Sequence, residues 1–151
     1  MRSLTTCCLS LLTILLMPIK SADGKKDLLC HHWLEVAFKA DMNAAVKPVD
    51  ASMAEDMMFK QDGTYNKTLY NGQMKITGNW YLNSDETKMD LTISSLNGKD
   101  VSQFNDTARH FNIIILKLSS DTLIYGEEFY RGKEGGPMVY NHSDRYLVRK
   151  D

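Results

Sequence analysis

The chain has 151 residues, of which 43% are hydrophobic and 25% charged, and its formal net charge is −1. This length and composition are typical of one soluble globular domain that is large enough to bury its own hydrophobic core. A nucleic-acid-binding surface needs a clustered excess of basic residues, and the sequence has neither a basic run nor a basic face. Nucleic acid is therefore not an expected partner.

The first residues have the order of a secretory signal peptide. Arg2 precedes an apolar run over residues 9–17, and small residues follow that run. The run is too short to span a bilayer comfortably, so we expect no stable membrane span once the signal is cleaved. The sequence predicts a signal peptide over residues 1–22, a mature domain over residues 23–151, and export to the periplasm or the extracellular space.

The mature domain begins with a thiol and two imidazoles in a row, Cys30, His31 and His32. On an extended strand the middle residue points away from the other two, so the three side chains cannot converge on one metal ion. With Cys7 and Cys8 in the signal segment, the mature chain has one cysteine and no internal disulfide. We expect no metal, no cofactor and no catalytic residue; a metal site and an enzyme are the weaker alternatives.

From residue 32 onward the hydrophobic pattern has a period of two, which is typical of β-strands. Asp62-Gly63 and Asn71-Gly72 are tight-turn signals, and Asn71-Gly72 is expected at the tip of a hairpin. Residues 50–58 are the one helix candidate, since Met53 and Met57 have the spacing of one helical turn. In chain order, the predicted strands cover residues 32–38, 57–59, 64–69, 74–82, 88–93, 111–118, 122–131 and 145–150.

The lengths of the connections indicate how these strands are arranged. The links over residues 61–63, 83–87 and 119–121 are short, whereas those over residues 40–56, 95–110 and 132–144 are long. In an up-and-down arrangement the short links fall at one end and the long links at the other. The sequence therefore predicts an all-β fold, an eight-stranded antiparallel up-and-down β-barrel with a closed floor and an open mouth.

Four features in order along the chain add a family resemblance: Trp33 at the start of the first strand, the Phe-x-x-Asp-Gly-Thr-Tyr turn that begins at Phe59, Gly78-Asn79-Trp80, and Arg149 in the last strand. Over residues 28–149 the chain resembles the lipocalin-like domains of the calycin group, particularly the small exported bacterial ones. His31 stands where that family usually has a glycine.

The resemblance implies structural roles for several of these residues. Trp33 would plug the barrel floor, and an arginine of the last strand, Arg149 or Arg145, would cover its indole ring through a cation–π contact. Gly78 and Trp80 would also be structural.

A barrel of eight strands is just wide enough to hold side chains or one small ligand. We therefore expect an exported binding protein for a small apolar molecule, without catalytic activity. The alternative is a protein-interaction module with a filled barrel that acts through its long rim loops, its partner being unknown. The expected ligand-binding wall consists of Val36, Phe38, Phe59, Met74, Ile76, Met89, Leu91, Tyr125 and Phe129.

Glu127 is the expected polar contact in that wall, because it alternates with Leu123 and Tyr125. A buried carboxylate needs a partner, which Arg131 or Arg145 could provide. Glu127 is thus either a polar anchor for a ligand or a member of a structural ion pair. A bulge near Gly126 would turn it to the outside instead.

Overall fold

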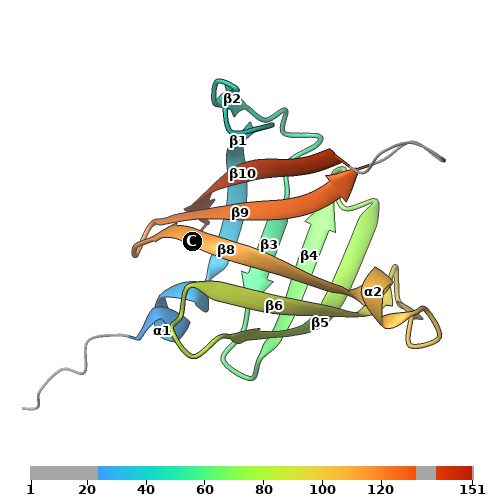
Figure 1. Cartoon of the computed structure of the whole chain (residues 1–151). Coiled ribbons are helices and arrows are strands. Elements are labelled where there is room, and N and C mark those ends of the chain that lie inside the picture. Colours follow the sequence, from blue (N-terminus) through green and yellow to red (C-terminus); the bar gives the residue numbers. More distant parts are fainter. Residues whose placement is uncertain (1–23, 132–138, 151) are drawn as a thin grey trace, which may run out of the picture.

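The sheet of this protein closes on itself. The computed structural model describes residues 24–131 and 139–150, so the predicted signal peptide lies outside the described residues. All strand pairs are antiparallel, and the first long strand pairs with the last (Figure 1). The eight strands of the barrel are β1 (His32–Lys39), β3 (Asp56–Phe59), β4 (Thr64–Leu69), β5 (Met74–Leu82), β6 (Lys88–Leu96), β8 (His110–Leu118), β9 (Thr122–Arg131) and β10 (Val139–Arg149).

The predicted eight-stranded antiparallel barrel is therefore confirmed. Two strands of two residues add to it: β2 (Lys47–Pro48) pairs with β1, and β7 (Lys99–Asp100) pairs with β6. The prediction missed two short helices, α1 (Lys25–Leu29) and α2 (Asp106–Arg109). Neither has enough residues to show the hydrophobic periodicity from which a helix is predicted.

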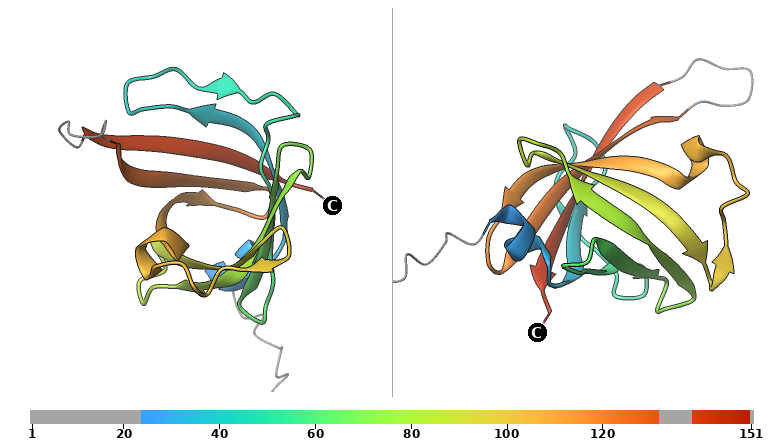
Figure 2. Two further views of the ribbon diagram at one scale, coloured as in Figure 1. Left: turned by 90° about the vertical axis from the view of Figure 1, so that its right-hand side faces the viewer. Right: turned by 90° about the horizontal axis from the view of Figure 1, so that it is seen from below.

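The two ends of the barrel differ as the link lengths predict. The short turns after β3, β5 and β8 lie at one end, the floor, and the long links after β1, β6 and β9 lie at the other, the mouth. Helix α1 lies at the floor and α2 at the mouth (Figures 1 and 2). Lys25 of α1 donates to the backbone oxygen of Glu86, and Gln61 donates to Asp27. These contacts attach α1 to two floor turns.

Two boundaries differ from the prediction. Residues 50–58 do not form a helix: one hydrogen-bonded turn closes from Met53 and Ala54 back to Asp50, and β3 then begins at Asp56. Strand β10 begins at Val139 rather than at residue 145, because it continues its pairing with β9 up to Arg131. The link between these strands is correspondingly shorter than predicted.

The floor half of the barrel is filled with apolar side chains. The core is made of residues that are 0–4% exposed and alternate along the strands, as period-two burial requires. Trp33 lies in this core, and its indole N–H donates to the backbone oxygen of Leu29 at 2.8 Å. The buried cluster comprises Leu29, Trp33, Met57, Phe59, Tyr65, Trp80, Met89, Leu91, Ile113, Leu123, Tyr125 and Leu147.

The floor around Trp33 is formed by helix α1 and His31, and Arg149 lies opposite Trp33 on the last strand. Helix α1 covers the indole from below, and His31 lies edge-on to it at 6.3 Å between ring centroids. Arg149 is the register partner of Trp33 on β10 and is exposed. Arg145, four positions before Arg149 on the same strand, lies beside Glu35.

A bulge in β1 decides which of its residues face inward. Trp33 and Glu35 are buried, and the register with β10 shifts between Glu35 and Ala37. The extra residue, Val36, is turned outward and is 41% exposed, so it does not share the inward face of Trp33 and Glu35. The inserted residue reverses the alternation, which brings Phe38 opposite the inward-facing Arg145.

Gly78 gives the sharpest test of this packing. A Cβ atom there would lie 2.0 Å from the backbone oxygen of Thr92 and 2.7 Å from the Tyr65 ring. We expect Gly78→Ala to lower the free energy of unfolding by about 3 kcal/mol, since overpacking displaces the backbone of a neighbouring strand. Urea denaturation measures this. Gly24→Ala, where a Cβ meets nothing within 4 Å, is the control, and equal stability of the two variants would contradict the packing described.

Candidate functional site

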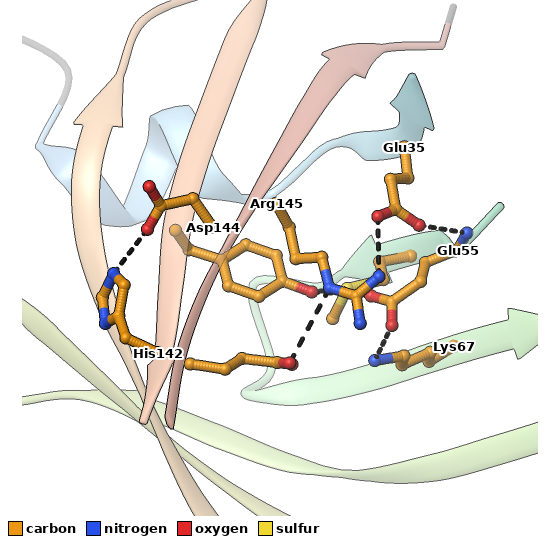
Figure 3. A network of polar contacts seen from close by, with 9 residues as sticks. Glu35, Glu55, Lys67, His142, Asp144 and Arg145 are labelled. Carbon is orange, nitrogen blue, oxygen red and sulfur yellow. Dashed lines mark hydrogen bonds and ion pairs between the residues drawn. The ribbon is translucent and has the colours of Figure 1, made fainter. Parts of the chain in front are cut away.

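Above the apolar core the barrel interior carries a network of charged side chains (Figure 3). Strand β1 supplies Glu35, β4 supplies Lys67 and β10 supplies Arg145, while Glu55 lies directly before β3. Each of the three strand residues lies on the same inward face of its strand as the residues of the apolar core. These charges therefore occupy positions where a fully apolar barrel would have hydrophobic residues. We call these residues, together with Tyr125 and Glu127 of β9, the interior network.

Glu55 is the centre of the network. Its carboxylate accepts a hydrogen bond from Tyr125 Oη at 2.6 Å and lies 2.7 Å from Lys67 Nζ. Glu55 is 3% exposed and Lys67 is 8% exposed, so this ion pair is removed from solvent. A buried pair of this kind is retained only when both charges have partners, which is the case here.

Arg145 connects the network to the first strand. Its Nη1 donates to Glu35 Oε1 at 2.9 Å, and the other oxygen of Glu35 accepts from the backbone N–H of Glu55. The Nε of Arg145 lies 3.8 Å from Glu127 Oε2, which is too long for a hydrogen bond. This Nε is buried and has no hydrogen-bond partner. Arg145 and Glu127 therefore attract each other without a hydrogen bond between them.

The network holds its two best-partnered groups in opposite protonation states. Burial alone would raise the pKa of Glu55, but Lys67 and Arg145 outweigh it and hold this pKa below its usual value. Burial raises the pKa of Tyr125 well above its usual value, and the carboxylate of Glu55 raises it further. At neutral pH, Glu55 is thus the charged acceptor and Tyr125 the neutral donor of their hydrogen bond.

The pKa of Glu127 is shifted in the opposite direction from that of Glu55. Burial raises its pKa above the usual value, and the neighbouring carboxylates add to the rise, against the opposing effect of Lys67 and Arg145. When all groups are ionised, the network contains three carboxylates but two cations. Glu127 is the carboxylate whose charge the network compensates least.

Phe38 and Arg145 lie in a pocket at the mouth of the barrel, which has a volume of about 390 Å³. Its walls come from β1, the hairpin end of β4 and the long link between β1 and β3, and are mainly apolar, with Asp50 as the charged exception. Glu55 and Arg145 form its base. We call this the mouth pocket; it is lined by Phe38, Val49, Asp50, Met53, Glu55, Leu69, Tyr70 and Arg145.

The other residues expected in the ligand-binding wall lie elsewhere. Phe59, Met89, Leu91 and Tyr125 are at most 2% exposed and belong to the packed core. Met74 and Ile76 are half-buried on the inward face of β5. The side chain of Phe129 lies outside the described residues.

The expected face of Glu127 is correct. It shares the inward side of β9 with Leu123 and Tyr125, and β9 pairs with β10 without interruption past Gly126. The bulge lies in β8 instead, between Ile115 and Lys117. Of the two candidate partners, Arg145 lies 3.8 Å from Glu127, and the side chain of Arg131 lies outside the described residues.

The sequence interpretation missed Glu35, Glu55 and Lys67. Glu35 and Lys67 carried a usable signal, because each lies two residues from a buried aromatic residue, Trp33 and Tyr65, on the same face of a strand. Glu55 carried none, since it precedes a strand of only four residues. Strand periodicity also could not predict the mouth-pocket residues in the long link, because these residues do not lie in a strand.

A second polar pair lies on the opposite face of β10 from Arg145. His142 Nε2 lies 2.6 Å from Asp144 Oδ1, and Lys39 Nζ lies 3.8 Å from Asp144 Oδ2. Gly126 of the neighbouring strand makes room for this pair, since a Cβ there would lie 2.8 Å from the His142 ring. The pair faces away from the interior network.

The residues that open the domain are separated by the fold. Cys30 caps α1, His31 lies against Trp33, and His32 bonds to Asp56 on the outside of the barrel. Within residues 24–131 and 139–150, no three His, Cys, Asp or Glu side chains are grouped so as to hold a metal ion. In the same part of the chain, no helix combines the length and apolar character needed to cross a membrane.

The fold and the interior define a closed eight-stranded antiparallel β-barrel with an apolar floor half and an ionic layer below its mouth. This architecture is compatible with the lipocalin-like fold that the sequence resembles. No protein-family model matches the chain, and no curated protein matches it.

The contrast between Glu55 and Glu127 predicts opposite effects of removing each charge. Glu55→Gln should lower the free energy of unfolding by about 3 kcal/mol at pH 7, because the buried Lys67 then loses the carboxylate that lies 2.7 Å from its Nζ. Glu127→Gln should leave stability at pH 7 unchanged or higher, since the network has one carboxylate in excess. Chemical denaturation of the two variants and the wild type measures this difference.

The pH dependence of stability is a second measurement of the contrast between Glu55 and Glu127. A lowered pKa means that the contribution of Glu55 is present above its usual pKa and is lost as pH falls through the folded-state value. A raised pKa means that the contribution of Glu127 is present below its usual pKa and is lost as pH rises through the folded-state value. The stability of the wild type should therefore decline as pH rises from the usual pKa of a glutamate to the raised pKa of Glu127. Glu127→Gln should abolish this decline. Equal pH profiles for both variants would contradict the assignment.

Proposed function

We propose that this chain is an exported, lipocalin-like binding protein that holds a small, largely apolar molecule in the mouth pocket. The observation that carries the proposal is the composition of that pocket, in which mainly apolar walls, with Asp50 as the charged exception, stand over a base formed by Glu55 and Arg145. Binding pockets for small molecules typically combine apolar walls with a few fixed polar groups. We propose no catalytic activity.

The size and position of the pocket support this function. A volume of about 390 Å³ lies within the ~300–1,000 Å³ range of small-molecule sites. The packed floor half leaves the mouth as the place where a ligand can enter, and the interior network fixes the base rigidly. A rigid base lowers the ordering cost of binding.

Export rests on the sequence. The order of charge, apolar run and small residues over residues 1–22 supports a signal peptide. The mature chain has one cysteine, Cys30, so the domain needs no disulfide to fold in an oxidising compartment.

A specific observation also favours the second candidate, a protein-interaction module. The long links at the mouth carry exposed apolar side chains: Met42 is 65% exposed, Val46 is 49% exposed and Phe104 is 53% exposed. Exposed apolar groups on rim loops are suited to a protein partner. Incubating the protein with lipid extract and analysing it by native mass spectrometry separates the candidates: a bound small molecule supports the first, and a protein that stays empty supports the second.

Two exposed methionines provide a matched test of the mouth pocket. Met53 lines the pocket and is 52% exposed, whereas Met58 lies on the outside of β3 and is 38% exposed. We expect Met53→Lys to weaken binding of the neutral apolar dye N-phenylnaphthylamine about tenfold, since a charge in an apolar wall must be desolvated. Met58→Lys should not change it. Fluorescence titration gives both values, and equal affinities of the two variants would argue against this pocket.

A further inference from the structure

The barrel wall is split between β8 and β9 on the mouth side. Pairing of these strands runs from Leu118 opposite Leu123 to Ile113 opposite Glu127, where it ends. Beyond that point β8 pairs with β6, and β9 pairs with β10 (Figures 1 and 2). A second pocket, of about 280 Å³, lies where the strands part. We call it the fork pocket; it is lined by Phe111, Asn112, Glu127 and Glu128.

Glu127 belongs to both the fork pocket and the interior network, but the network gives it weaker contacts than it gives the other two carboxylates. The other two carboxylates, Glu35 and Glu55, each accept hydrogen bonds of 2.6–3.0 Å. For Glu127 the contact within the described part of the chain is Arg145 Nε at 3.8 Å. Its side chain is 25% exposed, so a molecule in the fork pocket can reach it.

The charges around Glu127 decide which sign of ligand the pocket favours. Glu35, Glu55 and Glu127 face two cations, Lys67 and Arg145. An anion would bring a further negative charge into this region, whose pocket Glu127 and Glu128 already line, and the unpartnered Nε of Arg145 is too deeply buried to receive it. A cation would instead balance the excess carboxylate.

The remaining lining residues are also suited to an organic cation. Asn112 offers an amide oxygen as a second acceptor, and Phe111 offers an aromatic ring, which attracts an ammonium group through its π-face. A pocket of about 280 Å³ is too small for a long lipid chain but accommodates one ring with a short side chain.

We propose that the fork pocket binds the ammonium group of a small organic amine, with Glu127 as its carboxylate acceptor and Phe111 and Asn112 as its neighbours. This site is separate from the mouth pocket, and the Glu127–Arg145 contact lies between the two. It requires no ligand in the mouth pocket, so each site can be tested without the other.

Three probes of equal shape and different charge test the proposal: benzylamine, benzyl alcohol and benzoate. Titration of the isotope-labelled mature protein, followed by NMR, should show benzylamine shifting the amide signals of residues 111–112 and 127–128. Its affinity should exceed that of benzyl alcohol about tenfold, as expected for a hydrogen bond to a charged group. Benzoate should bind more weakly than both.

The variants separate the site from general electrostatic attraction. Glu127→Gln should reduce the affinity for benzylamine to that for benzyl alcohol, and Phe111→Leu should weaken benzylamine binding about threefold. Glu86→Gln removes the same charge at the barrel floor and should change nothing. Thermal melts confirm that each variant is folded. The proposal is overturned if benzoate binds best, if Glu127→Gln binds benzylamine like the wild type, or if the shifted signals lie elsewhere.

Discussion

The hydrogen bond from Arg145 to Glu35 joins the two ends of the folded chain from inside the barrel. Its partners lie on β10 and β1, the strands whose pairing closes the sheet, and are 110 residues apart in sequence. Glu35 also accepts the backbone N–H of Glu55, which places the first residue before β3. One carboxylate thus fixes the closing seam and positions the residue at the centre of the interior network.

The interior is divided into two layers with different physical roles. In the floor half, Trp33, Tyr65 and Trp80 pack with aliphatic residues, and this burial supplies the hydrophobic stabilisation of the barrel. The ionic layer above adds little net stability, because desolvation of buried charges offsets their attraction. Its effect is geometric: Glu55 and Arg145, which form the base of the mouth pocket, each have defined partners, so this base has one arrangement rather than several.

The fold could be predicted because strand alternation and link length are local signals. Asn71-Gly72 and Asp62-Gly63 carry their turn chemistry in the sequence, and Gly63 and Gly72 indeed adopt positive φ angles of 82° and 80°. The exact facing of β1 could not be predicted in the same way. The bulge at Val36 inserts one residue into an otherwise regular pattern, and nothing in the hydrophobicity of Leu34, Val36 and Phe38 distinguishes the inserted residue.

The site was less predictable because it depends on contacts between distant segments. Periodicity placed Glu127 on the inward face, but the choice between an ion pair and a ligand anchor depends on a distance to Arg145 that no local pattern encodes. Glu55 and the apolar residues of the mouth pocket lie in or beside a long link, where the chain follows tertiary contacts rather than a repeat. The sequence therefore indicated a mouth and a barrel, but not which side chains surround the pocket.

The fork pocket follows from two competing pairing preferences. The bulge between Ile115 and Lys117 shifts the register of β8 against β9, and the mouth end of β8 is paired with β6 from His110 to Ile114. Strand β9 cannot follow, because ten consecutive register pairs hold it to β10. The two strands must separate, and they do so at Ile113 and Glu127. The same separation that opens the wall leaves the excess carboxylate of the interior at its edge, which is why the charge imbalance of the network becomes accessible to a ligand.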